Sequence, residues 1–146
     1  MEIYERAMQL ASTIVKKLGG NFFRPSLEAI GDIGFETELS EIKPDINIMR
    51  KENMKLNKVF PWDEELNNSY DISHYLNVIP YIADFQKIIP FAFSFDGMWF
   101  CFDFRCNDQD PSVIWWDDDH WVRVAHNTND FINLFVTDLA SRKQPA

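Results

Sequence analysis

The fold of this protein is decided by the stretch Ile88-Ile89-Pro90-Phe91-Ala92-Phe93-Ser94-Phe95-Asp96-Gly97-Met98-Trp99-Phe100-Cys101-Phe102-Asp103-Phe104. Asp96-Gly97 lies between two apolar, aromatic runs, and this dipeptide is the strongest short-range signal for a tight β-hairpin. Simple alternation places Phe91, Phe93 and Phe95 on one face of the first strand. In the second strand, Trp99, Cys101 and Asp103 share a face. Runs this apolar predict a sheet that helices cover on one side.

A second hairpin is expected downstream. Its strands are Val113–Trp116 and Trp121–Ala125, and the connection between them is Asp117-Asp118-Asp119-His120. Asn127 or Thr128 can then cap a final helix, which carries apolar residues at helical spacing: Phe131, Leu134, Phe135 and Leu139.

Upstream of the hairpin the apolar residues have a different period. Residues 2–18 form an amphipathic helix that Gly19-Gly20 ends. A second helix begins at Ser26, and its apolar stripe continues to Ile42, where Lys43-Pro44 stops it. Residues 45–54 read as a polar connection, and residues 55–60 as a short strand before Pro61.

The order of helices, then a meander of strands, then a helix indicates an α+β fold. A chain of 146 residues has the usual size of one domain, so residues 1–146 are expected to form a single domain.

The charge is unevenly distributed along the chain. Residues 1–60 hold nine basic and nine acidic residues, whereas residues 61–146 hold five basic and fourteen acidic ones, so the net charge of −9 comes from the second part. Such a field repels nucleic acids and anionic membranes and attracts basic partners. The alternative is that the acidity serves only solubility.

The sequence favours a cytoplasmic location. Cys101 and Cys106 are an odd number of positions apart, which places them on opposite faces of a strand and disfavours a disulfide between them. Free thiols suit a reducing compartment. The N-terminus has charged residues at Glu2, Glu5 and Arg6 and does not resemble a secretory signal, and no run of residues is apolar enough for a membrane span.

Acidic loops are the candidate partner-binding sites. The carboxylates of Asp117, Asp118 and Asp119 could meet Lys and Arg side chains of a partner and steer its association. Asp108 and Asp110 follow the first hairpin and could extend the same acidic edge, as could Asp63-Glu64-Glu65. The alternative for each group is a solvated loop. Adjacent Asp residues cannot easily converge on one ion, so no metal site is expected.

Tryptophans flank these loops. Trp116 and Trp121, and also Trp62, could form cation–π contacts with an Arg-rich partner, whereas Trp99 and Trp115 are expected in the core. The alternative for any one of them is core packing.

An enzyme is not expected, because no nucleophile elbow, phosphate-binding loop, dinucleotide fingerprint or Cys-x-x-Cys is present. Asp103 in an apolar strand is a weak catalytic hint, which would gain weight if it were buried beside His120 or His126. A pair with Arg105, two positions on, is the simpler interpretation. No cofactor is expected.

The second part of the chain resembles the SUKH superfamily of bacterial toxin-immunity proteins and related regulators of yeast cell-wall synthesis. The resemblance covers about Ile88 to Leu139 and rests on the order of five features. The first three are Ile89-Pro90-Phe91, the turn Phe95-Asp96-Gly97 and the strand end Phe102-Asp103. They are followed by the Trp-containing hairpin, and then by Val124-Ala125-His126-Asn127-Thr128 with the helix that carries Phe131-Ile132-Asn133-Leu134-Phe135.

This resemblance implies an α+β fold with a curved, mostly antiparallel sheet flanked by N- and C-terminal helices. It also implies an immunity protein that neutralises a toxin, often a nuclease, by direct contact. We therefore expect a protein partner, a basic toxin domain, and neither nucleic acid nor membrane. The alternative is a housekeeping regulatory or scaffold module that binds a cellular partner or a small ligand.

Overall fold

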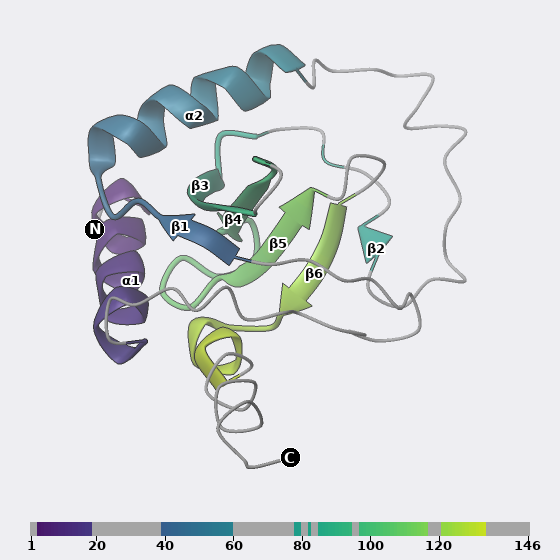
Figure 1. Cartoon of the computed structure of the whole chain (residues 1–146). Helices are drawn as coiled ribbons and strands as arrows, with labels where there is room; N and C mark the ends of the chain where they lie inside the picture. The colour runs from purple at the N-terminus through teal and green to yellow at the C-terminus, as the bar shows by residue number, and fades with distance from the viewer. Residues whose placement is uncertain are drawn as a thin grey trace, which may run out of the picture.

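An antiparallel sheet organises the computed structural model, which describes residues 3–18, 39–59, 78–79, 82, 85–94, 97–116 and 121–133 (Figure 1). The elements in chain order are α1 (Ile3–Lys17), β1 (Leu39–Ile42), α2 (Ile46–Val59), β2 (Val78–Ile79), β3 (Ile88–Ser94), β4 (Trp99–Asp103), β5 (Ser112–Trp116) and β6 (Trp121–Ala125). The strands lie in the order β1-β3-β4-β5-β6-β2, and each pair is antiparallel. The predicted α+β fold is confirmed.

Both predicted hairpins are present, and the first is closed by its glycine. Gly97 has a φ of 85°, a left-handed conformation that side chains with a Cβ rarely adopt. Its N–H donates to the Ser94 carbonyl over 2.9 Å, and the Ser94 N–H donates to the Met98 carbonyl over 2.8 Å. The second hairpin pairs Trp116 with Trp121.

A β-bulge changes which residues of β3 share a face. The register with β4 shifts between Pro90 and Ala92, so that Phe91 is an additional residue on its strand. The Phe91 ring stacks on Phe102 with centroids 4.0 Å apart, whereas Phe93 lies opposite Trp99. The prediction that Phe91 and Phe93 share a face is therefore wrong, because the bulge interrupts the alternation. Phe95 lies outside the described residues.

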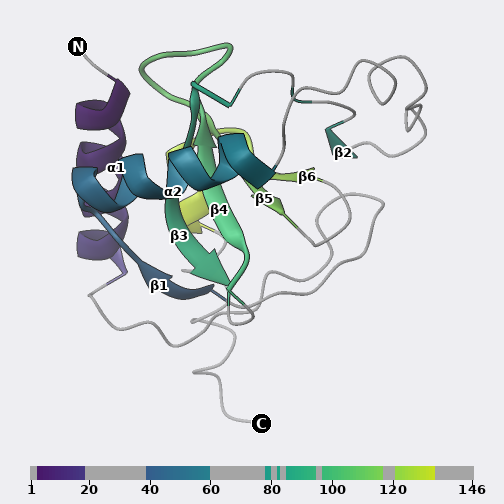
Figure 2. The same cartoon turned by 90° about the horizontal axis from the view of Figure 1, so that it is seen from above.

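Helices pack on both faces of the sheet, not on one as predicted (Figures 1 and 2). One face packs with α1 and with the helical residues 128–133, and its core includes Ile14, Phe91, Phe100, Phe102 and Phe131. The other face packs with α2, and its core includes Leu56, Phe85, Ile88, Cys101, Ile114 and Trp121. The interior strands are buried on both sides, which explains why their sequences are nearly continuously apolar.

Helix α2 is the main difference from the sequence prediction, which placed a polar connection at 45–54 and a strand at 55–60. The Asp45 carboxylate caps the helix by accepting hydrogen bonds from the N–H groups of Asn47 and Ile48. The inner face of the helix buries polar residues, Glu52 and Asn53, together with Met49 and Leu56. Because half of this buried face is polar, hydrophobic periodicity could not reveal the helix.

Asn53 attaches α2 to the beginning of β3. Its side-chain amide donates to the carbonyl oxygens of Phe85 and Ile88, both over 2.7 Å. Buried carbonyl groups need such donors, so these two bonds fix the position of the helix along the sheet.

The segment around Ile42 is also corrected. Residues Leu39–Ile42 form the edge strand β1, which pairs with β3, and do not continue a helical stripe. The N–H of Lys43 extends this pairing to the Phe91 carbonyl over 2.8 Å. The helix expected from Ser26 begins outside the described residues.

The terminal helices begin as predicted. Helix α1 buries Ala7, Leu10 and Ile14. Asn127 caps the last helix, since its side-chain oxygen accepts from the Asp130 N–H over 2.8 Å. Leu134, Phe135 and Leu139 lie outside the described residues. None of the described helices combines the length and the apolar character that a bilayer crossing requires.

We predict that Asn53→Ala destabilises the protein by about 1–3 kcal/mol, because the Phe85 and Ile88 carbonyl groups each lose a buried hydrogen bond, although the Phe85 carbonyl still accepts from the Ile88 N–H. Urea denaturation followed by circular dichroism measures the change. Asn47→Ala is the matched control, since Asn47 lies on the exposed side of the same helix. Equal stability of the two variants would show that the Asn53 bonds do not hold α2 in place.

Candidate protein-binding site

Four aromatic residues form a row across one end of the sheet. Phe93, Trp99, Trp116 and Trp121 come from β3, β4, β5 and β6, and we call them the aromatic row. Phe93 pairs with Trp99, and Trp116 pairs with Trp121. The pairing of Phe100 with Trp115 places Trp99 next to Trp116. Strands are about 4.8 Å apart, so residues paired in this way are neighbours. The three tryptophans belong to or pack against the core under α2, and Phe93 joins the row through its pairing with Trp99.

The members of the row differ in exposure. Trp121 is only 5% exposed and belongs to the core under α2, whereas Trp116 is half-buried. The two rings are tilted against each other with centroids 5.4 Å apart. The Trp121 ring also contacts the Phe85 ring, whose centroid is 5.9 Å away. The sequence placed both tryptophans in the binding site. The structure brings them together, and the buried Trp121 ring packs against the half-buried Trp116 ring.

Glu52 of α2 joins the row, although no sequence pattern indicates it. The Trp99 Nε1–H donates to Glu52 Oε2 over 3.0 Å, and Lys55 Nζ contacts Glu52 Oε1 over 3.0 Å. These two donors offset the cost of burying a carboxylate. Trp99 is expected in the core, but it is only half-buried, with its indole N–H on the Glu52 carboxylate. The sequence signal was absent, because the helix that carries Glu52 was itself not predicted.

The predicted acidic residues are not all at this end of the sheet. Asp117, Asp118 and Asp119 lie outside the described residues, as do His120 and Asp63-Glu64-Glu65 with Trp62. Trp116 and Trp121, which precede and follow the 117–120 segment, pair at the end of β5. Asp108 and Asp110 lie in the connection that enters β5 at Ser112, and Ser112 is about 13 Å from Trp116 along the strand. They are therefore not next to Trp116.

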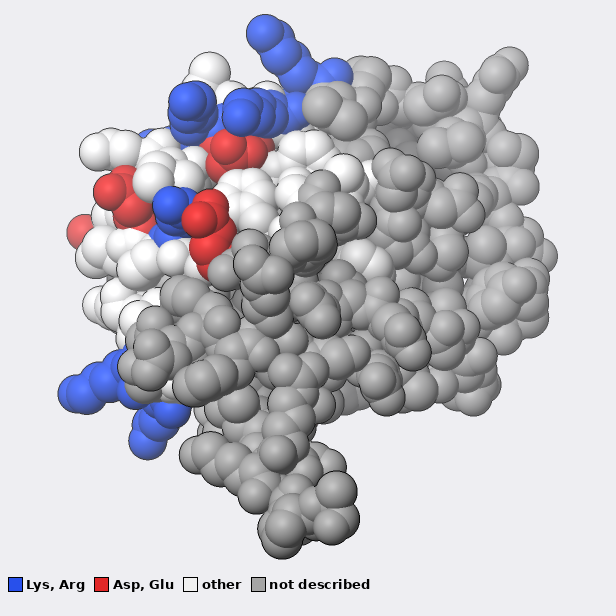
Figure 3. Space-filling model, in the orientation of Figure 1, with Lys and Arg blue, Asp and Glu red and all other residues white. Residues whose placement is uncertain are grey.

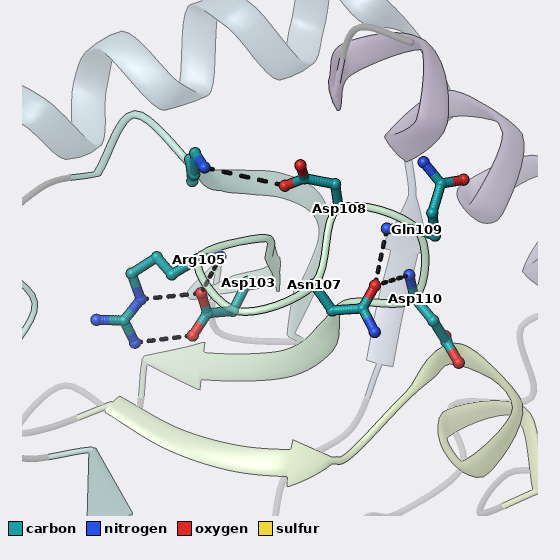
Figure 4. A network of polar contacts seen from close by, with 7 residues as sticks. Asp103, Arg105, Asn107, Asp108, Gln109 and Asp110 are labelled. Atoms are coloured by element: carbon teal, nitrogen blue, oxygen red, sulfur yellow. Dashed lines mark hydrogen bonds and ion pairs between the residues drawn. The ribbon is translucent and has the colours of Figure 1, made fainter.

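The connection between β4 and β5 is internally bonded (Figure 4). The Asn107 side-chain oxygen accepts from the N–H groups of Gln109 and Asp110, each over 2.9 Å. Arg6 of α1 donates through Nε to the Gln109 carbonyl over 2.7 Å. These bonds hold the connection against α1.

The two aspartates of this connection have different surroundings. Asp110 Oδ1 accepts from the Thr128 N–H over 3.4 Å, at the beginning of the last helix, where N–H groups lack helical partners. Asp108 is exposed and lies 3.9 Å from Lys87 Nζ. An ion pair of this kind contributes about 0–1 kcal/mol, so Asp108 is the more accessible of the two for a partner.

Asp103 pairs with Arg105, as the simpler interpretation predicted. Arg105 donates through Nε and Nη2 to the two carboxylate oxygens over 2.9 and 2.8 Å (Figure 4). This hydrogen-bonded pairing raises the pKa of the Arg105 guanidinium above its ordinary value. His126 is exposed after the end of β6. Within the described ranges, no three His, Cys, Asp or Glu side chains gather in a way that could hold a metal ion.

The described part of the chain is basic, although the whole chain is acidic. It contains eleven Lys and Arg against eight Asp and Glu, a net charge of +3, while the whole chain carries −9. Figure 3 shows Lys and Arg side chains gathered over α2 at the top of the view. The acidity that suggested a basic partner therefore belongs mainly to the residues outside the described ranges.

We predict that Cys106 reacts with a thiol reagent in the native protein and Cys101 does not. Both thiols are free, but Cys101 is buried, and burial followed by the charge of Asp103 raises its pKa well above the ordinary value. The thiolate is the reactive form. Titration with an aromatic disulfide reagent should label one thiol in the folded chain and both in denaturant. Cys106→Ser should abolish native labelling, and labelling that survives this substitution would contradict the burial of Cys101.

Comparison with known proteins agrees with this architecture. A family model described as the SMI1 / KNR4 family (SUKH-1) matches residues 13–134, from the second half of α1 to the last helix. No curated protein and no solved structure matches the chain. The match confirms the resemblance from Ile88 to residue 134 and extends it over α2 and β1. The chain belongs to the SMI1 / KNR4 family (SUKH-1) of the SUKH superfamily.

Proposed function

We propose that this protein is a cytoplasmic immunity protein that neutralises a bacterial toxin by direct binding. Its binding surface is centred on Trp116 and on Asp117, Asp118 and Asp119. Family membership supports a module that acts through a protein partner, in toxin immunity or in regulation, and not through catalysis. Free thiols in the described chain suit the reducing compartment in which such a protein would meet an incoming toxin.

The position of Trp116 carries the proposal. Its indole is half-buried at the end of β5, and Trp121 holds it from the core side. A partner would therefore meet a large aromatic surface whose orientation is already fixed, so that little side-chain entropy is lost on binding. Tryptophans of this kind are frequent binding hot spots.

The three carboxylates that follow Trp116 in the chain define the chemistry of the partner. An Arg or Lys side chain could contact the indole face and a neighbouring carboxylate at once, which combines a cation–π contact with an ion pair. Nucleases present such side chains to nucleic acid. Opposite charges raise the association rate and make it sensitive to salt.

Asp108 and Asp110 have a secondary role in this proposal. A partner that contacts them as well as Trp116 has to cover the whole length of β5. Asp110 also supports the last helix through the Thr128 N–H, so its substitution would disturb the fold as well as any interface. Trp121 acts as a positioning residue, because it is almost completely buried.

We predict that reversing the charges of Asp117, Asp118 and Asp119 to Lys weakens binding of the toxin by about 100-fold or more, mainly through slower association. The partner is first recovered from native lysate by pull-down at low salt, and its affinity is then measured by surface plasmon resonance. Asp108→Lys at the other end of β5 tests the secondary contact and should change the affinity less than about threefold. Recovery of housekeeping proteins alone would favour the regulatory alternative.

We predict that Trp116→Ala lowers the affinity for the toxin by about tenfold or more, because the partner loses an aromatic contact at the centre of the surface. Trp121→Ala should instead lower the melting temperature, since it leaves a cavity in the core. Calorimetry and binding measurements on the same samples separate the two effects. An unchanged affinity for both the Trp116 and the Asp117–Asp119 variants would remove this end of the sheet from the interface.

A further inference from the structure

Helix α2 presents a basic surface to solvent. Lys51, Met54, Lys55 and Lys58 are three or four positions apart, so they lie on one side of the helix, and all four are exposed. We call them the basic face. The opposite side of the helix, with Met49, Glu52, Asn53 and Leu56, is buried against the rest of the protein. Figure 3 shows Lys and Arg over this helix.

The stability of the helix explains these lysines only in part, because Lys58 in the last turn suits the helix dipole and Lys55 pairs with Glu52, whereas Lys51 has neither role. Lys51 is four positions from Lys55, and Lys55 is three positions from Lys58, and like charges at these spacings destabilise a helix. Only Lys55 has a carboxylate partner, Glu52, over 3.0 Å. Within the described part of the chain, no salt bridge or hydrogen bond involves the side chains of Lys51 and Lys58. The two charges are therefore available to another molecule.

Met54 adds an apolar contact in the middle of the charges. Its side chain is 71% exposed, and no other large apolar residue among those described is exposed. Methionine is flexible and polarizable, so it adapts to partner side chains of different shape. Cations around one exposed apolar side chain fit a ligand that has carboxylates around one apolar group.

We propose that the basic face of α2 docks a short acidic segment of a partner protein, with an apolar side chain that covers Met54. The 14 residues of α2 extend about 21 Å, which about six residues of an extended peptide would span. This surface differs in position and in charge from the toxin-binding surface proposed above, so the two proposals do not depend on each other.

The net charge of the whole chain favours a short acidic peptide as the ligand over nucleic acids and anionic membranes. A net charge of −9 repels nucleic acids and anionic membranes, which are long enough to meet the field of the entire molecule. A short peptide on α2 experiences mainly the charges within a Debye length of about 8 Å at physiological salt. Within α2 itself, four basic side chains stand against one carboxylate, that of Glu52.

Fluorescence anisotropy with the full chain tests the proposal. The probe is a fluorescein-labelled peptide of alternating Asp and Glu with a central Leu. Its binding should weaken by at least about tenfold for Lys51→Glu/Lys58→Glu and by several fold for Met54→Ser, and it should weaken with salt. Lys16→Glu/Lys17→Glu on α1 is the matched control and should leave the affinity unchanged. Circular dichroism verifies that each variant is folded.

Three results would overturn the proposal. The first is equal peptide binding by the α2 variant and the α1 control. The second is tighter binding of a DNA duplex or of phosphatidylserine vesicles through Lys51 and Lys58. The third is salt-sensitive self-association in sedimentation experiments that the α2 variant abolishes, which would make a second copy the occupant. Peptide binding should persist in the Asp117–Asp119 variant, so failure of the toxin-binding proposal is recognised separately.

Discussion

Two hydrogen bonds from one side chain determine where the second helix lies. The Asn53 amide donates to the Phe85 and Ile88 carbonyl oxygens at the beginning of β3, over 2.7 Å each. Because these bonds fix α2 against the sheet, Leu56 reaches the core and Glu52 reaches the Trp99 indole. The same placement turns the lysines outward. The core under α2, the aromatic row and the basic face therefore all depend on this attachment.

The protein separates two kinds of surface. At one end of the sheet, Trp116 is held by Trp121 and is followed in the chain by three carboxylates. On the outer side of α2, lysines surround Met54. A uniformly acidic chain would attract only basic partners, whereas this distribution allows ligands of opposite charge at different places. Net charge bears on long polyanions, whereas the recognition of short protein segments depends on the local charges at each surface.

The polar connection between β4 and β5 shows how acidic residues can serve the fold. Asp110 supports the start of the last helix, and Asp103 holds Arg105 in a two-point pair. Both carboxylates are accounted for by contacts within the protein. Acidic residues that follow the half-buried Trp116 in the chain are better candidates for recognition than those already engaged in hydrogen bonds. A partner that bound the engaged groups would have to break existing contacts.

Several parts of the structure follow from local sequence patterns alone. Asp96-Gly97 between apolar runs specified the first hairpin, the regular spacing in residues 3–17 specified α1, and Asn127 specified the start of the last helix. The order of these features also indicated the family. All of these signals arise from interactions between residues close in the chain, so they can be read without the fold.

The remaining features depend on contacts between segments that are distant in the chain. Helix α2 escaped prediction because its buried face includes Glu52 and Asn53, whose partners come from β3 and β4. The bulge at Phe91 reversed the expected face of Phe93, and exposure distinguished Trp116 from Trp121, which sequence treated alike. The course of β5 also separates Asp108 from Trp116, because the two residues lie at opposite ends of this strand. Each of these depends on contacts between distant segments, which a local sequence pattern does not encode.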